Sequence, residues 1–338
     1  MRRYKVAIVG VGLVGTELVR VLREREFPMA ELRIIATRGR KEEIDDVLYE
    51  VHAASAEQFE GVDIAFFAGT EGARGASRQW GWLAVEKGAV VIDNGDDFRM
   101  DQRVPLVVPE VNAEALREHH GFIANPNCST IQLVMALAPL HRVARIKRVV
   151  VSTYQAVSGT GKAAVDELIS QATRVLRGES VEPQVYPHPI AFNCFPHVSS
   201  LSPDFPGYYN EEAKMIRETR KILGEPDLRI TATCVRIPVF NGHSEAVNVE
   251  FERPLSPEEA REILSAAPGV AVVDDPAQAL YPTPRMASGR DEVFVGRIRR
   301  DPSCENALDM WVVADNIRKG AALNAVQIAE KMIAMGLL

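Results

Sequence analysis

The order of apolar and polar positions predicts that the first third of the chain alternates strands with helices. The chain opens on KVAIVG, a β-branched apolar run that breaks at glycines, and apolar residues then recur at helical spacing at Leu18, Val19 and Leu22. The segments ELRIIAT, VDIAFFAG and AVVIDN repeat the short apolar run. Strands that alternate with helices form a parallel sheet with helices on both faces, so this part predicts an α/β domain.

The pattern changes after Asn125. The segments RVVVSTYQAV, RITATCVRIPV and EAVNVEFERP are longer, alternate between apolar and polar residues, and have few helices between them. Helices are predicted at about 160–176 and about 211–223, the second with Asn210 as its N-cap and Gly224 at its end. This part predicts a second, α+β domain.

The last segment, DNIRKGAALNAVQIAEKMIAM, is amphipathic at helical spacing and has no strand after it. We therefore expect this helix to return to the first domain. The predicted division assigns residues 1–127 and 315–338 to the first domain and residues 128–314 to the second. A chain of 338 residues is long enough for about two domains.

Composition and charge exclude several classes of function. The chain is 46% hydrophobic and 25% charged, which is typical of a folded protein, and its net charge of −7 argues against nucleic acid as a partner. The opening MRRYKVAIVG lacks the features of a signal peptide, and no apolar run approaches the ~20 residues of a membrane helix. We expect a cytoplasmic protein. The four cysteines show no metal-binding spacing, so we expect reduced thiols and no metal site.

Three glycines separate the first predicted strand from the first predicted helix in the pattern G-x-G-x-x-G. Glycines in this place let backbone amides and a helix N-terminus approach a pyrophosphate. We expect a Rossmann-type dinucleotide-binding domain with cofactor contacts at Gly10, Gly12, Leu13, Val14 and Gly15. The alternative is a glycine turn in an ordinary α/β protein.

The end of the second predicted strand indicates which dinucleotide binds. An NAD site usually has an acidic residue there, roughly 20 residues after the glycines, to hold the ribose hydroxyls. This chain has Thr37 and Arg38 instead, with Arg40 close behind. A hydroxyl and guanidinium groups suit a 2′-phosphate, so we predict NADP. The alternative is a solvated basic turn.

The hexapeptide NPNCST contains the best candidate for a nucleophile. Its Cys128 lies just before the helical pattern IQLVMALAPL, and a thiolate at a helix N-terminus is favoured by the helix dipole and the unpaired amides. For Cys194, Cys234 and Cys304 we expect instead the role of a small buried apolar residue.

The motifs NPNCST, STYQAVSGTGK, PIAFNCFPH, RIPVFNGHSEAVNVEF and DNIRKGAALNAVQIAE together resemble the bacterial aspartate-semialdehyde dehydrogenase family, in the same order and at similar spacing over nearly the whole chain. The resemblance implies NADPH-linked reductive dephosphorylation of L-aspartyl-4-phosphate to L-aspartate-4-semialdehyde, in lysine, threonine and methionine synthesis. It also implies a homodimer formed through the second domain, which could pair further into a tetramer.

The resemblance assigns roles to individual residues. Cys128 matches the nucleophile that carries the acyl group, His243 the catalytic acid and base, and Gln155 the residue that positions the acyl intermediate. For the substrate it implies Arg236 on the α-carboxylate, Glu211 on the amine, and a set of phosphate or substrate contacts at Arg99, Asn127 and Lys214. Further cofactor contacts are expected at Ser158, Gly159 and Asn316. Without the resemblance, Glu211 and Lys214 would be interpreted as a surface ion pair and His243 as a loop histidine.

The sequence departs from the family pattern in two places. The glycine loop is one residue shorter in its first turn than the usual G-x-x-G-x-x-G. Near Arg99, this chain has Gly95 and Asp96 where the family usually has small hydroxyl residues. An acid beside a phosphate site weakens anion binding unless it points away.

Three alternatives are open. N-acetyl-glutamyl-phosphate reductase uses the same thioester chemistry, but its nucleophile motif usually has Gly-Cys-Tyr where this chain has Asn127-Cys128-Ser129. Malonyl-CoA reductase would not require an acidic partner for an amine. A catalytically silent NADP-binding paralogue is disfavoured because the candidate nucleophile, histidine, glutamine and arginine are all present.

Overall fold

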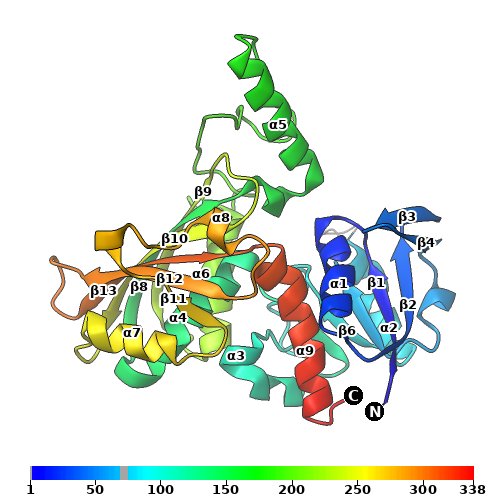
Figure 1. The fold of residues 1–338 in the computed structure, drawn as a ribbon. Coiled ribbons are helices and arrows are strands. Elements are labelled where there is room, and N and C mark those ends of the chain that lie inside the picture. Colours follow the sequence, from blue (N-terminus) through cyan, green and yellow to red (C-terminus); the bar gives the residue numbers. More distant parts are fainter. Residues whose placement is uncertain (1, 69–74) are drawn as a thin grey trace. The chain divides into compact units, whose positions relative to one another are not determined.

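The computed structural model describes residues 2–68 and 75–338. The chain forms two compact units: Met1–Asn127 together with Ala321–Leu338, and Cys128–Gly320. Each unit has its own sheet (Figure 1). Within the described residues, no helix is long and apolar enough to cross a membrane.

The first unit contains a seven-stranded sheet in the order β3-β4-β2-β1-β5-β6-β7. Its strands are β1 (Tyr4–Val9), β2 (Met29–Ala36), β3 (Arg40–Ile44), β4 (Val47–Ala53), β5 (Ile64–Phe67), β6 (Val90–Asp93) and β7 (Phe122–Ala124). All neighbours are parallel except β3 and β4. The predicted alternation of strands and helices is confirmed for β1, β2, β5 and β6. The β3–β4 hairpin was not predicted, because its largely exposed, charged sequence contains no apolar run.

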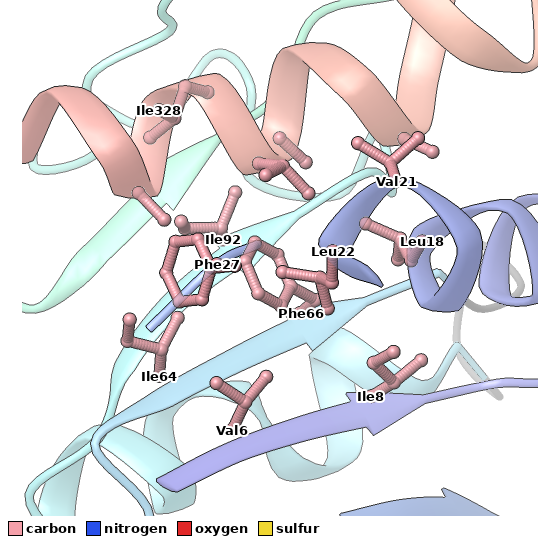
Figure 2. Close-up of a cluster of buried hydrophobic side chains, with 14 of the residues drawn as sticks. Val6, Ile8, Leu18, Val21, Leu22, Phe27, Ile64, Phe66, Ile92 and Ile328 are labelled. Atoms are coloured by element: carbon pink, nitrogen blue, oxygen red, sulfur yellow. The ribbon is translucent and has the colours of Figure 1, made fainter. Parts of the chain in front are cut away.

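Helices cover this sheet and close its core. They are α1 (Leu13–Glu24), α2 (Ala76–Glu86), α3 (Pro109–Asn112) and α9 (Leu323–Ala334), with short 3₁₀ turns at Ala56–Phe59 and Ala113–Glu118. Figure 2 shows side chains of α1 and of the C-terminal α9 on the same face of the sheet, where Leu22 and Ile328 belong to the same buried cluster as Phe66 of β5. Full burial of one such side chain stabilises the fold by roughly 1.5–3 kcal/mol.

The second unit contains a six-stranded mixed sheet in the order β11-β12-β13-β10-β8-β9. Its strands are β8 (Ile146–Gln155), β9 (Arg229–Arg236), β10 (His243–Phe251), β11 (Val270–Val272), β12 (Val293–Arg300) and β13 (Ala307–Ala314). Its helices are α4 (Cys128–Ala144), α5 (Lys162–Leu176), α6 (Asn210–Leu223), α7 (Pro257–Ser265) and α8 (Pro284–Ala287), with short turns at Val157–Thr160 and Pro276–Gln278. A further helical turn, Arg318–Ala322, begins in this unit and ends in the first. The helices α4, α6 and α7 pack against this sheet and α5 projects from it (Figure 1). The predicted α+β class is confirmed.

The two helices predicted in this unit are present as α5 and α6. Gly224 adopts the left-handed conformation (φ 69°) that ends α6, as predicted. The predicted N-cap was wrong by one residue, because Asn210 is already helical and Tyr209 is the N-cap. The side chain of Glu212 accepts a hydrogen bond from the Tyr209 N–H at 2.8 Å, and this bond fixes the start of the helix.

Residues 315–320 belong to the second unit, although the sequence placed the return to the first domain at residue 315. The carboxylate of Asp315 accepts hydrogen bonds from Asn241 Nδ2 at 2.7 Å and from the Gly289 N–H at 2.8 Å. The side-chain oxygen of Asn316 accepts one from the Gly242 N–H at 2.9 Å. These bonds tie the segment to the loop before β10 and to Gly289, which follows α8.

Candidate active site

Three of the predicted site residues form one row across the sheet of the second unit. Ser244 of β10 lies opposite Tyr154 of β8, so His243 lies at the level of Gln155. In the parallel pair of β8 and β9, Gln155 lies opposite Arg236. All three side chains of the row are buried. Strand register thus brings together residues that are far apart in the sequence.

The side-chain amide of Gln155 connects this row to the helix that begins with Cys128. Gln155 Nε2 donates to Ser129 Oγ at 2.9 Å and lies 3.3 Å from Glu211 Oε1. Cys128 is the first residue of α4, as predicted, and is partly exposed. A Cβ on Gly320 would lie only 2.9 Å from Cys128 Cβ, so a larger residue at position 320 would displace the thiol.

The backbone of Ala156 orients both the histidine and the arginine of the row. Its N–H donates to His243 Nδ1 at 3.0 Å, and its carbonyl accepts from Arg236 Nη1 at 2.6 Å. A Cβ on Gly159 would lie 3.2 Å from His243 Nε2 and 3.4 Å from Arg236 Nη1. The glycine therefore leaves room beside the two groups that face the site.

The electrostatic setting keeps the histidine neutral. Burial, and next the positive charge of Arg236, hold the pKa of His243 well below its usual value. Within the described part of the chain, His243 Nε2 has no hydrogen-bond partner although it is buried. A buried polar atom of this kind is available for a ligand.

Tyr186 is a residue that the sequence did not indicate. Its ring packs against the guanidinium of Arg236, 5.7 Å from ring centroid to Cζ, and its hydroxyl donates to Thr160 Oγ1 at 2.9 Å. Tyr186 lies between α5 and α6 in a segment without regular structure, where no periodic signal exists. It supports the arginine from the side.

The start of α6 carries the other two predicted substrate contacts of this unit. Glu211 is buried, and Lys214, three residues later, is half-buried. Burial of Glu211 argues against the interpretation as an exposed surface pair, because such a pair keeps both side chains in solvent.

In the first unit, the predicted phosphate residue Arg99 is buried and held by backbone carbonyls. Its Nε donates to the carbonyl of Asn125 at 3.0 Å and its Nη2 to that of Asn94 at 2.7 Å. The acidic neighbour Asp97 pairs with Arg78 at 3.0 Å. These contacts fix the guanidinium at the ends of β6 and β7. Asn127 is also buried in this unit.

A network of asparagines organises the same region and was not predicted. Asn324 of α9 donates to Asn125 Oδ1 at 2.7 Å and to the carbonyl of Val107 at 3.0 Å. Asn125 Nδ2 in turn donates to Asn94 Oδ1 at 2.8 Å. The network joins the C-terminal helix to the segment that leads into Cys128. Its members lie inside quoted sequence motifs, but their pairing is a tertiary feature.

The glycine loop has the geometry that a pyrophosphate site requires. Gly10 has φ +106°, and a Cβ on Gly15 would lie 1.9 Å from the Gly10 carbonyl oxygen, so a side chain is excluded at Gly15. Gly12 is the N-cap of α1, and nothing lies within 4 Å of a Cβ placed there. The first amides of α1, beginning at Leu13 and Val14, are left without a side-chain cap. These residues fit the phosphates of a dinucleotide.

The turn after β2 carries the predicted 2′-phosphate contacts. Thr37 and Arg38 are both exposed. Arg40 pairs with Glu42 at 2.7 Å, whereas Arg38 makes no ion pair with any residue of the described ranges. The guanidinium of Arg38 can therefore bind a phosphate group.

The remaining predicted cofactor residues of the second unit are close to the loop before β10. Ser158 Oγ donates to Asn241 Oδ1 at 3.1 Å and accepts from Asn316 Nδ2 at 2.9 Å. Both Ser158 and Asn316 are buried. In this structure they hold the turn that precedes His243.

The other cysteines differ from one another. Cys234 is buried, as expected, but Cys194 is exposed and Cys304 is partly exposed. The prediction was wrong for Cys194 because it lies in a surface segment, where its N–H is bonded by Asn193 Oδ1 at 2.9 Å. Among the described residues, no group of three histidine, cysteine, aspartate or glutamate side chains could hold a metal ion.

The comparisons with known proteins agree with this geometry. A family model described as "Semialdehyde dehydrogenase, NAD binding domain" matches residues 5–119, and one described as "Semialdehyde dehydrogenase, dimerisation domain" matches residues 137–319. The fold and the site therefore define an oxidoreductase of the semialdehyde dehydrogenase class.

Relatives that match over the full length show which kind of semialdehyde dehydrogenase the chain resembles. An aspartate-semialdehyde dehydrogenase from Aquifex aeolicus is 52% identical, with 99% of each chain covered, and one from Bacillus subtilis is 46% identical, with 100% of this chain and 99% of the relative covered. A crystal structure of aspartate semialdehyde dehydrogenase II complexed with ASA from Vibrio cholerae has a TM-score of 0.93 at 43% identity, with 99% of each chain covered. The chain belongs to the aspartate-semialdehyde dehydrogenase family, and the resemblance seen in its sequence is confirmed.

Proposed function

We propose that the chain catalyses the NADPH-dependent reductive dephosphorylation of L-aspartyl-4-phosphate to L-aspartate-4-semialdehyde, through an acyl group carried on Cys128. The row of Gln155, Arg236 and His243, connected through Gln155 to the first turn of α4, is the observation that carries the proposal. The product is a precursor for lysine, threonine and methionine, so the enzyme serves amino-acid biosynthesis.

Each side chain of the site has a role in the reaction that follows from its chemistry. Cys128 reacts as a thiolate, favoured at the N-terminus of α4, and displaces phosphate to leave a thioester. Gln155 orients the acyl group. Arg236 binds the α-carboxylate through its planar guanidinium, and the buried Glu211 binds the amine. Arg99, Asn127 and Lys214 contact the phosphate end of the substrate.

The cofactor is NADP, bound by the glycine loop and selected by the turn after β2. Gly10, Gly12, Leu13, Val14 and Gly15 contact the pyrophosphate. Thr37 and Arg38 bind the 2′-phosphate, and Ser158, Gly159 and Asn316 contact the nicotinamide side. When bound, NADPH supplies the hydride that reduces the thioester. We propose further that the second unit forms a homodimer.

The proposal is tested with the reverse reaction. Phosphate-dependent reduction of NADP is measured with aspartate semialdehyde, in parallel with N-acetylglutamate semialdehyde and with malonate semialdehyde plus coenzyme A. We expect turnover with aspartate semialdehyde only, and loss of turnover in Cys128→Ser with NADPH binding retained. Preference for either rival substrate, or full activity of Cys128→Ser, would refute the assignment. A protein that binds NADPH but turns over none of the three would be the silent paralogue.

A further inference from the structure

Two buried polar side chains of α5 hold a segment that has no regular structure. Glu167 and Gln171 lie one turn apart on this helix, and both are buried although α5 projects from the sheet (Figure 1). The carboxylate of Glu167 accepts hydrogen bonds from the backbone N–H groups of Gln184 at 2.8 Å and Val185 at 2.7 Å. It also accepts one from Gln171 Nε2 at 2.7 Å. We refer to Glu167 and Gln171 as the α5 pair.

The second member of the pair holds the other end of the same segment. Gln171 Oε1 accepts hydrogen bonds from the backbone N–H groups of Ile190 at 2.8 Å and Ala191 at 3.2 Å. Gln171 Nε2 also donates to the carbonyl of Glu182 at 3.3 Å. Breaking such bonds is unfavourable, because a buried donor or acceptor would be left without a partner. The α5 pair therefore fixes residues 182–191 at both ends.

Tyr186 lies in the middle of this segment and packs against Arg236. The guanidinium carbon lies 5.7 Å from the centroid of the Tyr186 ring, within the range of a cation–π contact. The Tyr186 hydroxyl donates to Thr160 Oγ1 at 2.9 Å, which fixes the ring at its outer end. Phe195 contacts the same ring, with centroids 5.6 Å apart, and exchanges two backbone hydrogen bonds with Arg236 at 2.9 and 3.2 Å. The segment and its continuation thus contact both the side chain and the backbone of Arg236.

One edge of the Arg236 guanidinium is left for a ligand. Its Nη1 donates to the Ala156 carbonyl at 2.6 Å, whereas its buried Nε has no hydrogen-bond partner among the described residues. A carboxylate binds a guanidinium in its plane through two parallel bonds, so the direction of that plane decides where the carboxylate lies. Resting on the proposed function, we infer that Glu167 and Gln171 are positioning residues that act through Tyr186 to fix the plane in which Arg236 binds the substrate α-carboxylate.

The first test compares two variants of Tyr186 in the reverse assay. Tyr186→Leu removes the ring, and Tyr186→Phe keeps the ring but loses the bond to Thr160. We expect the Michaelis constant for aspartate semialdehyde to rise about 5- to 30-fold in Tyr186→Leu and less than about threefold in Tyr186→Phe. Because the carboxylate bond persists throughout the reaction, kcat and the constants for NADP and phosphate should stay within about twofold of wild type. An unchanged constant for the semialdehyde in Tyr186→Leu would overturn the inference.

The second test acts on the α5 pair itself. Glu167→Ala should raise the Michaelis constant for aspartate semialdehyde at least about fivefold, in the same way as Tyr186→Leu. Asp166→Ala is the matched control, since Asp166 is the neighbouring carboxylate of α5 but is exposed and paired with Lys162. Loss of folded protein lowers kcat and leaves the Michaelis constant unchanged, so a defect confined to kcat would contradict a positioning role. If Glu167→Ala does not fold, Gln171→Ala is measured by the same criterion, because it keeps the bonds from Glu167 to the segment.

A double variant tests whether the pair acts through the tyrosine. If it does, Glu167→Ala combined with Tyr186→Leu should have a Michaelis constant within about twofold of Tyr186→Leu alone, because the ring that Glu167 positions is already absent. A constant that rises by the product of the two single effects would show that Glu167 acts by another route, and the inference would then be wrong.

The last test needs no turnover. In ¹H–¹⁵N NMR spectra, the Nε–H signal of Arg236 is identified by its absence in Arg236→Lys, and its position depends on the ring current of Tyr186. We expect this signal to move in Tyr186→Leu and in Glu167→Ala, and to stay near its wild-type position in Tyr186→Phe and Asp166→Ala. A signal that stays in place in Glu167→Ala would overturn the inference. Absence of wild-type turnover with aspartate semialdehyde would instead refute the proposed function, and this measurement would still decide the positioning role.

Discussion

At the scale of single residues, backbone groups fix the charged side chains of this protein. Ala156 has no functional side chain, yet its N–H and carbonyl orient His243 and Arg236. Arg99 is likewise held by the carbonyls of Asn94 and Asn125. Groups fixed in this way are preorganised, so binding a substrate anion requires little further ordering of the side chain.

The assignment of Arg99 to phosphate predicts a selective defect. Arg99→Ala should raise the apparent constant for inorganic phosphate in the reverse assay by roughly 10- to 100-fold, because a charge-assisted bond worth about 1.5–3 kcal/mol is lost. The constant for aspartate semialdehyde should change little. Arg78→Ala is the matched control, since it removes a nearby cation that pairs with Asp97. An unchanged phosphate constant in Arg99→Ala, with a larger defect in Lys214→Ala, would place the phosphate on α6.

Asp93 at the end of β6 predicts a dependence of stability on pH. Burial raises its pKa to about 6, although the Gly95 N–H donates to its carboxylate at 2.9 Å. The folded state therefore binds a proton more tightly than the unfolded chain, and the stability that this proton provides is complete below about pH 4 and lost as the pH rises to about 6. The free energy of unfolding therefore falls by about 3 kcal/mol as the pH rises from about 4 to above about 6.

Replacement by asparagine isolates this effect. The free energy of unfolding of Asp93→Asn should gain about 3 kcal/mol relative to wild type between pH 4 and pH 7, on top of any constant offset from altered hydrogen bonds. Urea denaturation at several pH values measures the difference. A difference that does not vary with pH would mean that Asp93 titrates normally.

At the scale of elements, strand register decides which side chains meet. Beside the row of predicted catalytic residues lies a second buried row, in which Glu245 of β10 is opposite Thr153 of β8, and Thr153 is opposite Cys234 of β9. Burial raises the pKa values of Cys234 and Glu245 well above their usual ranges. Both groups are thus neutral, so they add no charge beneath the site.

The turn between β2 and β3 predicts the cofactor preference. Arg38→Ala should raise the Michaelis constant for NADPH by roughly 10- to 100-fold and leave that for NADH nearly unchanged, because only NADPH carries the 2′-phosphate. Arg40→Ala is the control, since Arg40 is also exposed but is paired with Glu42. Equal losses with both cofactors in Arg38→Ala would show that this arginine acts elsewhere.

At the scale of the whole molecule, the first unit is completed by the end of the chain. Side chains of α9 fill the core beside α1 (Figure 2), and Asn324 ties this helix to the segment before Cys128. The core of this unit therefore includes side chains from both ends of the chain. The nucleophile therefore follows a segment whose position depends on the last helix.

Truncation of one buried side chain tests this dependence. Ile328→Ala should lower the free energy of unfolding by about 2–4 kcal/mol, because it removes a fully buried side chain and leaves a cavity. Ile169→Ala in α5, where the side chain is 49% exposed, should cost less than about 0.5 kcal/mol. Urea denaturation compares the two, and similar losses would mean that α9 contributes little to the core.

The sequence by itself determined what local interactions control. It fixed the strand, glycine turn and helix at the start of the chain, the end of α6 at Gly224, and the place of Cys128 at the start of α4. Hydrophobic periodicity, helix caps and glycine conformations depend on a few neighbouring residues. They can therefore be predicted from the sequence. Family motifs added the names of distant site residues but not their arrangement.

Only the tertiary structure decided how these residues meet. The β3–β4 hairpin, the asparagine network, the contact of Tyr186 with Arg236 and the bond from Ala156 to His243 all join positions whose spacing in the sequence carries no period. Strand register and side-chain packing set these contacts, and both depend on the complete fold. The family motif thus pointed to the histidine, and the fold determined which groups surround its ring.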